Sequence, residues 1–218
     1  KSPNVDNGYD ISDYQAINPE FGTLEDLKDL LAAAHELGIR LIMDLVVNHT
    51  SDQHPWFIES KKGKDNPYRD YYLWADATPE KMPNNWQSFF GGSTWTYDPN
   101  TKQAYFHVFA KEQPDLNWKN PAMRENIYQM IRWWLDFGID GFRLDAISHI
   151  QKEPWDFKIT TNPWAPFMNV VGIETYMAEL REIFRSYDIM TVGEASGVNS
   201  KTAPFWTDEE SEIGRAHV

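Results

Sequence analysis

One pattern occurs three times in this chain: an amphipathic helix, a short turn, a strongly apolar strand and then a polar residue. The predicted strands cover residues 39–47, 139–144 and 189–192, and each follows a predicted helix. Strands that alternate with helices pair in parallel, because each helix carries the chain back to the same end of the sheet. The pattern therefore predicts an α/β fold with a parallel sheet.

The ends of the predicted helices support this assignment. Thr23 is a good N-cap with an acidic residue three positions later, and Asn120 precedes a proline in the first turn of the second helix. Gly38 and Gly138 follow the first two helices, where glycine commonly ends a helix. The first helix has an apolar stripe, formed by Leu24, Leu27, Leu30, Leu31, Ala34 and Leu37.

The polar residues just after the three strands are His49, Asp145 and Glu194. In a parallel barrel the active site lies at the C-terminal ends of the strands. A doubly wound open sheet would also bind ligands there, but it normally carries a glycine-rich phosphate loop, and this sequence has none. The three residues are therefore candidates for one site.

Residues 50–112 interrupt the helix–strand pattern. This stretch is polar and rich in aromatic residues, and only residues 103–109 alternate like a strand. Long irregular connections are usually functional. We expect a small inserted subdomain that leans over the site.

Composition narrows the function classes. The net charge is −13, which disfavours nucleic acid and anionic membranes as partners. The chain has no cysteine, so disulfides and thiolate metal sites are excluded, and no apolar run approaches the ~20 residues of a membrane helix. The aromatic content of 15% suits either a large core or a sugar-binding site.

Both ends of the chain look irregular. The sequence starts at Lys1 without a methionine, and we expect that the natural N-terminus is missing. Residues 212–218 continue no pattern, and we expect a non-native tail there. We expect a bacterial cytoplasmic protein, although a lost secretion signal would leave export open.

The residues at the strand ends suit cleavage of a glycosidic bond. Arg143 and Asp145 share one face of a strand, so the guanidinium should keep the carboxylate ionised and ready to attack. Glu194 has no basic neighbour in sequence, and apolar surroundings would raise its pKa and make it a general acid. A retaining mechanism needs such a pair roughly 5 Å apart.

Each of these residues also has a purely structural interpretation. Arg143 and Asp145 suit a plain ion pair, Glu194 suits an ordinary turn, and His49 suits a hydrogen-bonded core position. His49 with Asp44 and Asp52 is not a convincing set of metal ligands, so no metal is predicted.

Five motifs resemble those of the α-amylase superfamily, glycoside hydrolase family 13. Residues 44–49 (DLVVNH), 141–145 (GFRLD) and 192–194 (VGE) are similar to three of its ordered signature motifs. Residues 113–117 (QPDLN) and 6–13 (DNGYDISD) resemble its oligo-1,6-glucosidase and α-glucosidase branch. The resemblance covers nearly the whole chain.

The resemblance implies a role for each candidate. Asp145 would be the nucleophile and Glu194 the acid/base. The pocket for a terminal glucose would be lined by Asp6, Tyr9, His49, Gln113 and Arg143, with aromatic walls from Phe90 and Phe109. No cofactor is implied, and the expected partner is a small oligosaccharide, while the oligomeric state stays open.

The implied fold is a (β/α)8 barrel, of which this chain would hold about strands two or three to five. Residues 1–49 and 113–211 would belong to the barrel, and residues 50–112 to a subdomain inserted after the third strand. The family's third carboxylate, in an Asn-His-Asp motif, and a possible calcium site after the first strand would lie outside the chain. We therefore expect these 218 residues alone to be poorly stable and inactive.

Linkage preference depends on the residue after the nucleophile. Family members that favour α-1,6 links tend to carry valine there, whereas this chain has Ala146, which favours α-1,4 links. The expected activity is that of a retaining α-glucosidase on short oligosaccharides. The alternatives are an oligo-1,6-glucosidase, a sucrose isomerase, a trehalose-6-phosphate hydrolase and a non-catalytic homologue.

Overall fold

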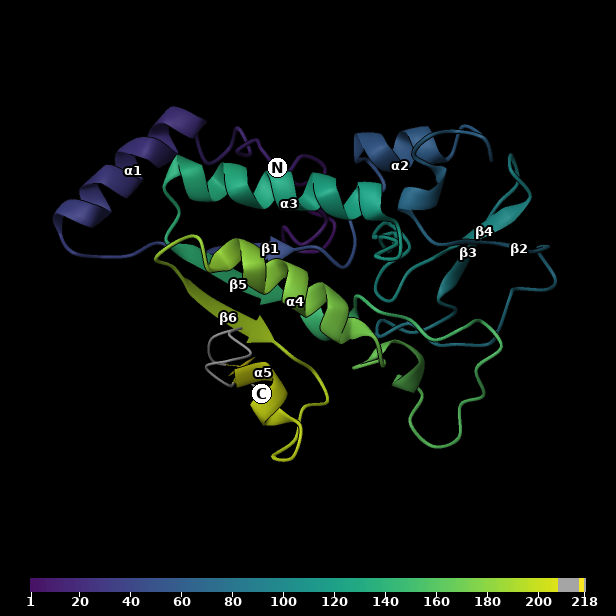
Figure 1. Ribbon diagram of the computed structural model, residues 1–218. Helices are drawn as coiled ribbons and strands as arrows, with labels where there is room; N and C mark the ends of the chain where they lie inside the picture. The colour runs from purple at the N-terminus through teal and green to yellow at the C-terminus, as the bar shows by residue number, and fades with distance from the viewer. Residues whose placement is uncertain (208–215, 218) are drawn as a thin grey trace.

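The computed structural model describes residues 1–207 and 216–217 (Figure 1). Its helices are α1 (Leu24–Glu36), α2 (Pro55–Ser60), α3 (Pro121–Phe137), α4 (Ile173–Phe184) and α5 (Ala203–Thr207), with 3-10 turns η1 (Arg69–Tyr71), η2 (Ile147–His149) and η3 (Ala165–Phe167). Its strands are β1 (Met43–Val46), β2 (Trp74–Asp76), β3 (Trp95–Asp98), β4 (Gln103–Phe106), β5 (Gly141–Asp145), β6 (Met190–Glu194) and β7 (Ala216–His217).

The predicted parallel sheet is present, with strand order β1-β5-β6-β7 and parallel pairing throughout. Val46 pairs with Asp145, and Leu144 pairs with Gly193, so β1, β5 and β6 end at the same edge. Helices α3 and α4 run alongside the sheet (Figure 1), and their apolar faces join its side chains in one buried core. The α/β prediction is confirmed.

Three local features hold this arrangement. Thr23 and Asp26 form a full capping box at the start of α1, and Gly138 ends α3 in the left-handed region with φ 116°. Gly141 opens β5 with φ 145°, and a Cβ there would lie 1.7 Å from the carbonyl oxygen of Met190. Any side chain at Gly141 would push β5 and β6 apart.

The first predicted strand was too long. Only Met43–Val46 form β1, while Ile39 and Ile42 are 54% and 39% exposed. Among the described residues β1 pairs only with β5, and of the residues just before it Leu41 is partly buried against the core. The apolar stripe of α1 is also partly exposed, and only its residues Leu31 and Ala34 are buried.

A second sheet lies between β1 and α3 in the sequence. Its strands are antiparallel with the order β2-β4-β3, and Figure 1 draws it apart from the parallel sheet. This region has its own buried cluster, made up of Trp86, Trp95, Ala104, Phe106, Val108 and Phe167. Phe167 comes from the loop after β5, so that loop helps to attach the small sheet to the large one.

The remaining predictions concern the C-terminal tail and membrane-spanning helices. Most of the predicted tail, residues 212–215 and 218, lies outside the described residues, while the backbone of Ala216–His217 pairs with β6. Among the described residues, no helix is both long enough and apolar enough to cross a bilayer.

Candidate active site

A cavity of about 380 Å³ opens where the parallel strands end. It receives residues from the N-terminal segment, from the ends of β1, β5 and β6, and from the loops around the small sheet. Every predicted site residue except Gln113 lines it. The lining residues are Asp6, Tyr9, His49, Phe89, Phe90, Phe109, Arg143, Asp145, Ala146, His149, Glu194 and Ser196.

The Arg143 guanidinium contacts three carboxylates, of which Asp145 and Glu194 line the cavity. Its Nη1 donates to Asp145 Oδ1 at 2.9 Å and also contacts Asp44, while its Nη2 lies 3.1 Å from Glu194 Oε2. The contact with Asp145 was predicted. The contact with Glu194 was not, because Glu194 has no basic neighbour in sequence and gains one only through the pairing of β5 with β6.

The protonation of Asp145 differs from the prediction that Arg143 would simply keep it ionised. Burial raises the pKa of Asp145 to about 7, although the hydrogen bond from Arg143 acts in the opposite direction. The nearby charge of Glu194 raises the pKa further. The Asp145 side chain is 11% exposed, so loss of water outweighs the guanidinium.

The backbone after Asp145 takes an unusual turn. Ala146 has φ 48°, in the left-handed region that few residues other than glycine adopt. This turn directs its N–H to Glu194 Oε2 at 3.1 Å. The residue that the sequence singled out for linkage preference therefore also holds Glu194 through its backbone.

Gln113 lies behind the cavity wall. The resemblance had implied that Gln113 would line the cavity, but it does not. It is fully buried, and its Nε2 donates to Asp6 Oδ2 at 2.9 Å and lies 3.1 Å from His49 Nε2. The His49 ring is also buried, and burial lowers its pKa. Gln113 thus supports two residues that do line the cavity.

Aromatic rings form a second wall of the cavity. Phe89 stacks on Phe109 with centroids 5.5 Å apart, Phe90 lies 5.8 Å from Phe109, and Phe109 lies 5.1 Å from the His49 ring. Phe89 was not predicted, although it stands next to Phe90 in the sequence.

His149 and Ser196 also line the cavity and were not predicted. They follow Asp145 and Glu194 by four and two residues, so their distance from a strand end was the available signal. Within the part of the chain that the structure describes, no cluster of three or more histidine or acidic residues is arranged to hold a metal ion.

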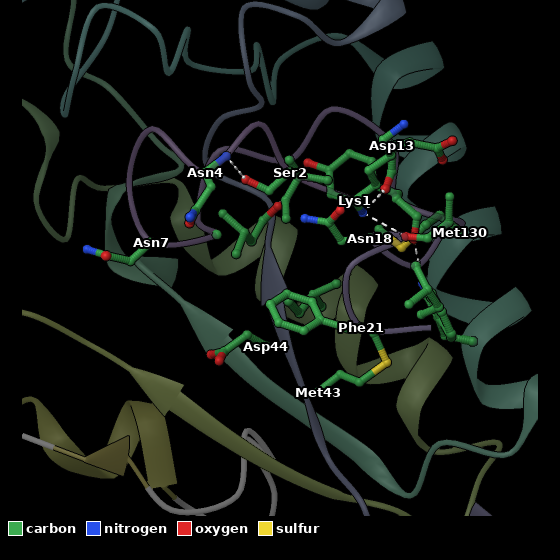
Figure 2. Close-up of a pocket in the computed structure, with 18 of the residues that line it drawn as sticks. Lys1, Ser2, Asn4, Asn7, Asp13, Asn18, Phe21, Met43, Asp44 and Met130 are labelled. Carbon is green, nitrogen blue, oxygen red and sulfur yellow. Dashed lines mark hydrogen bonds between the residues drawn. The ribbon is translucent and has the colours of Figure 1, made fainter. Parts of the chain in front are cut away.

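A second cavity of about 310 Å³ lies between the N-terminal segment, β1 and α3 (Figure 2). The amino group of Lys1 closes this segment on itself by donating to the carbonyl groups of Asp13 and Ala16. No predicted site residue lines this cavity. Asp44 lines this cavity and also contacts Arg143, which lines the first cavity.

Comparison with known proteins supports the family resemblance. The model for "Alpha amylase, catalytic domain" matches residues 1–215. An oligo-1,6-glucosidase of Halalkalibacterium halodurans is 54% identical over 96% of this chain and 39% of its own length. An α-glucosidase of Pediococcus pentosaceus is 49% identical over 93% of this chain and 38% of its own.

Solved structures of related enzymes also resemble this chain in fold and sequence. A trehalulose synthase MutB mutant in complex with the substrate sucrose has a TM-score of 0.94 at 43% identity, covering 100% of this chain and 40% of that one. A trehalose-6-phosphate hydrolase of Bacillus licheniformis has a TM-score of 0.93 at 43% identity, covering 99% of this chain and 40% of that one. The chain thus spans well under half the length of these relatives.

Proposed function

Since this chain belongs to the α-amylase family, glycoside hydrolase family 13, we propose that its protein releases terminal α-linked glucose from short oligosaccharides with retention of configuration. The observation that carries the proposal is the pair Asp145 and Glu194. They stand at the ends of adjacent parallel strands, and one guanidinium contacts both. Two carboxyl groups this close suit a double displacement, whereas an inverting enzyme leaves room for a water between them.

In this mechanism ionised Asp145 attacks the anomeric carbon while Glu194 protonates the leaving oxygen. The bond from sugar to leaving group breaks, and an ester between glucose and Asp145 forms. Glu194, now a carboxylate, takes a proton from water, and the resulting hydroxide cleaves the ester and restores Asp145. Arg143 supports the ionised form of Asp145 and orients both acids.

We further propose that residues 50–112 form a subdomain inserted between barrel segments 1–49 and 113–211. The separate antiparallel sheet and its own aromatic cluster support this division. Phe90 and Phe109 would then face the apolar side of a sugar ring from the subdomain, while Asp6, Tyr9 and His49 would meet its hydroxyl groups.

For linkage, we propose a preference for α-1,4 over α-1,6 bonds, because the small side chain of Ala146 lines the cavity next to Asp145. A second candidate is α-1,6 hydrolysis, which the names of several similar proteins favour. The values of kcat/KM for maltose and isomaltose distinguish the two. A maltose-to-isomaltose ratio above one indicates α-1,4 preference, and a ratio below one indicates α-1,6 preference.

The proposed reaction is tested on the full-length gene product with an aryl α-glucoside. Proton NMR of the first glucose released should show the α anomer before mutarotation. First release of the β anomer would exclude the double displacement, and absence of any turnover on α-glucosides would exclude the glucosidase assignment.

A further inference from the structure

A buried lysine ammonium contacts the backbone of His149, a residue that lines the active-site cavity. The Lys152 side chain is 4% exposed, and its Nζ lies 2.7 Å from Asp115 Oδ2 and 2.8 Å from Asn48 Oδ1. It also donates to the carbonyl oxygen of His149. An ammonium has three protons, so these oxygens satisfy it. They come from the end of β1, from the segment after β4 and from the turn after β5.

The contact with Lys152 fixes the orientation of the Asn48 amide. An ammonium can only donate, so the oxygen of the amide must face Lys152. The amide nitrogen of Asn48 then faces His49 Nδ1, at a distance of 3.2 Å. Because an amide nitrogen also only donates, Nδ1 has to accept, and it carries no proton.

The surroundings of the other ring nitrogen agree with this tautomer. His49 Nε2 lies 3.1 Å from the carbonyl oxygen of Tyr9, which can only accept. Gln113 Nε2 lies equally close, so it would favour an unprotonated Nε2. A proton on Nε2 satisfies the contacts with Asn48 and Tyr9, whereas a proton on Nδ1 satisfies only the contact with Gln113.

Charge around His49 acts together with these hydrogen bonds. Burial lowers the pKa of the imidazole, and the Lys152 charge lowers it further. Asp115, Asp6 and the Tyr9 carbonyl group act in the opposite direction. Lys152 thus offsets the nearby carboxylates, while the amide of Asn48 leaves no acceptor for a proton on Nδ1.

We propose that Lys152 is a positioning residue, which holds His49 through Asn48 as the neutral tautomer with its proton on Nε2. The imidazole that lines the cavity would then have one defined hydrogen-bonding pattern, with a donor at Nε2 and an acceptor at Nδ1. Only the kinetic consequence rests on the proposed glucosidase function, because the tautomer is a property of the free protein.

The direct test is nitrogen NMR of the full-length gene product labelled with ¹⁵N-histidine, at neutral pH. The His49 signals are assigned by their loss in His49→Gln. We expect Nδ1 unprotonated and Nε2 protonated in the wild type. In Asn48→Asp a carboxylate of nearly the same shape replaces the amide, and Nδ1 should become protonated. A wild-type His49 with its proton on Nδ1, or an unprotonated Nδ1 in Asn48→Asp, would overturn the proposal.

Lys152→Met removes the donor that orients Asn48, so we expect the single His49 tautomer to be replaced by a mixture. KM should rise at least tenfold, with a smaller change in kcat. Lys28→Met is the matched control, because Lys28 is exposed on α1 and pairs there with Glu25, and it should change neither quantity. Unchanged His49 signals in a folded Lys152→Met would overturn the proposal.

If Lys152→Met does not fold, the nitrogen NMR spectrum of Asn48→Asp decides whether Asn48 sets the tautomer of His49. If the wild type shows no glucosidase activity, the spectra still decide on the tautomer, so the two proposals fail separately.

Discussion

The two walls of the cavity are built in different ways. The charged wall stands on β5 and β6, where strand pairing sets the positions of Arg143, Asp145 and Glu194 to within hydrogen-bonding distance. The aromatic wall stands on loops, where ring contacts such as Phe89 with Phe109, 5.5 Å apart, hold the side chains. Strand register is set by the backbone, whereas a loop wall depends on how side chains pack. We therefore expect the charged wall to control the chemical step and the aromatic wall to control binding.

The largest effect is expected from the charged wall. Asp145→Asn should lower kcat of the full-length protein by roughly 10⁴- to 10⁶-fold, the scale of losing a nucleophile. Glu194→Gln should cost about 10²- to 10⁴-fold, as for a lost general acid. Steady-state rates on maltose measure both, with Asp188→Asn on the surface as the control. Normal hydrolysis by Asp145→Asn would disprove its assignment as the nucleophile.

The next effect concerns pH. A carboxylate ionises as pH rises, so kcat/KM should increase with pH through the pKa of Asp145, which is about 7 in the empty cavity. In Arg143→Gln the hydrogen bond that lowers this pKa is gone, and the rise should occur at higher pH. A pH–rate profile of kcat/KM for each protein tests this. An unshifted profile in Arg143→Gln would mean that Arg143 does not govern the ionisation of Asp145.

The aromatic wall should give a smaller effect of another kind. Phe109→Ala removes the ring that contacts Phe89, Phe90 and His49. KM for maltose should rise about 10-fold, the scale of a lost aromatic contact worth ~1.5 kcal/mol, while kcat changes less. Phe109→Leu keeps the apolar volume and is the matched control. A fall in kcat with KM unchanged would contradict the proposed division between the two walls.

An effect of similar size, on selectivity between substrates, is expected at Ala146, the residue after Asp145. Ala146→Val should shift the ratio of kcat/KM for isomaltose over maltose upward by about 10-fold, near the lower limit for one methyl-scale change. Its positive φ should also cost ~1–2 kcal/mol of stability with a branched side chain. Ala146→Gly avoids that strain and serves as the control. An unchanged ratio in a folded Ala146→Val would remove the basis for the linkage proposal.

Much of the site was predicted, and the reason is visible in particular residues. His49, Asp145 and Glu194 follow apolar strands, and parallel strands bring such residues to one edge. The other predicted lining residues came from the family resemblance, which the comparisons confirm, whereas Phe89, His149 and Ser196 were not predicted. Their roles, the domain boundaries and the compartment stay predictions. The predicted length of the first strand and the predicted place of Gln113 in the cavity lining were wrong. Both depend on how distant segments pack around these residues.

The sequence by itself determined the elements and their order. Helix caps, apolar periodicity and the glycines after α1 and α3 act over a few residues, so they can be read locally. Only the tertiary structure decided which charges meet: Arg143 with Glu194, Lys152 with Asp115 and Asn48, and Gln113 with Asp6. These partners lie far apart in the chain, and no local pattern joins them. The raised pKa of Asp145 belongs with them, because burial depends on every segment that excludes water from its carboxylate.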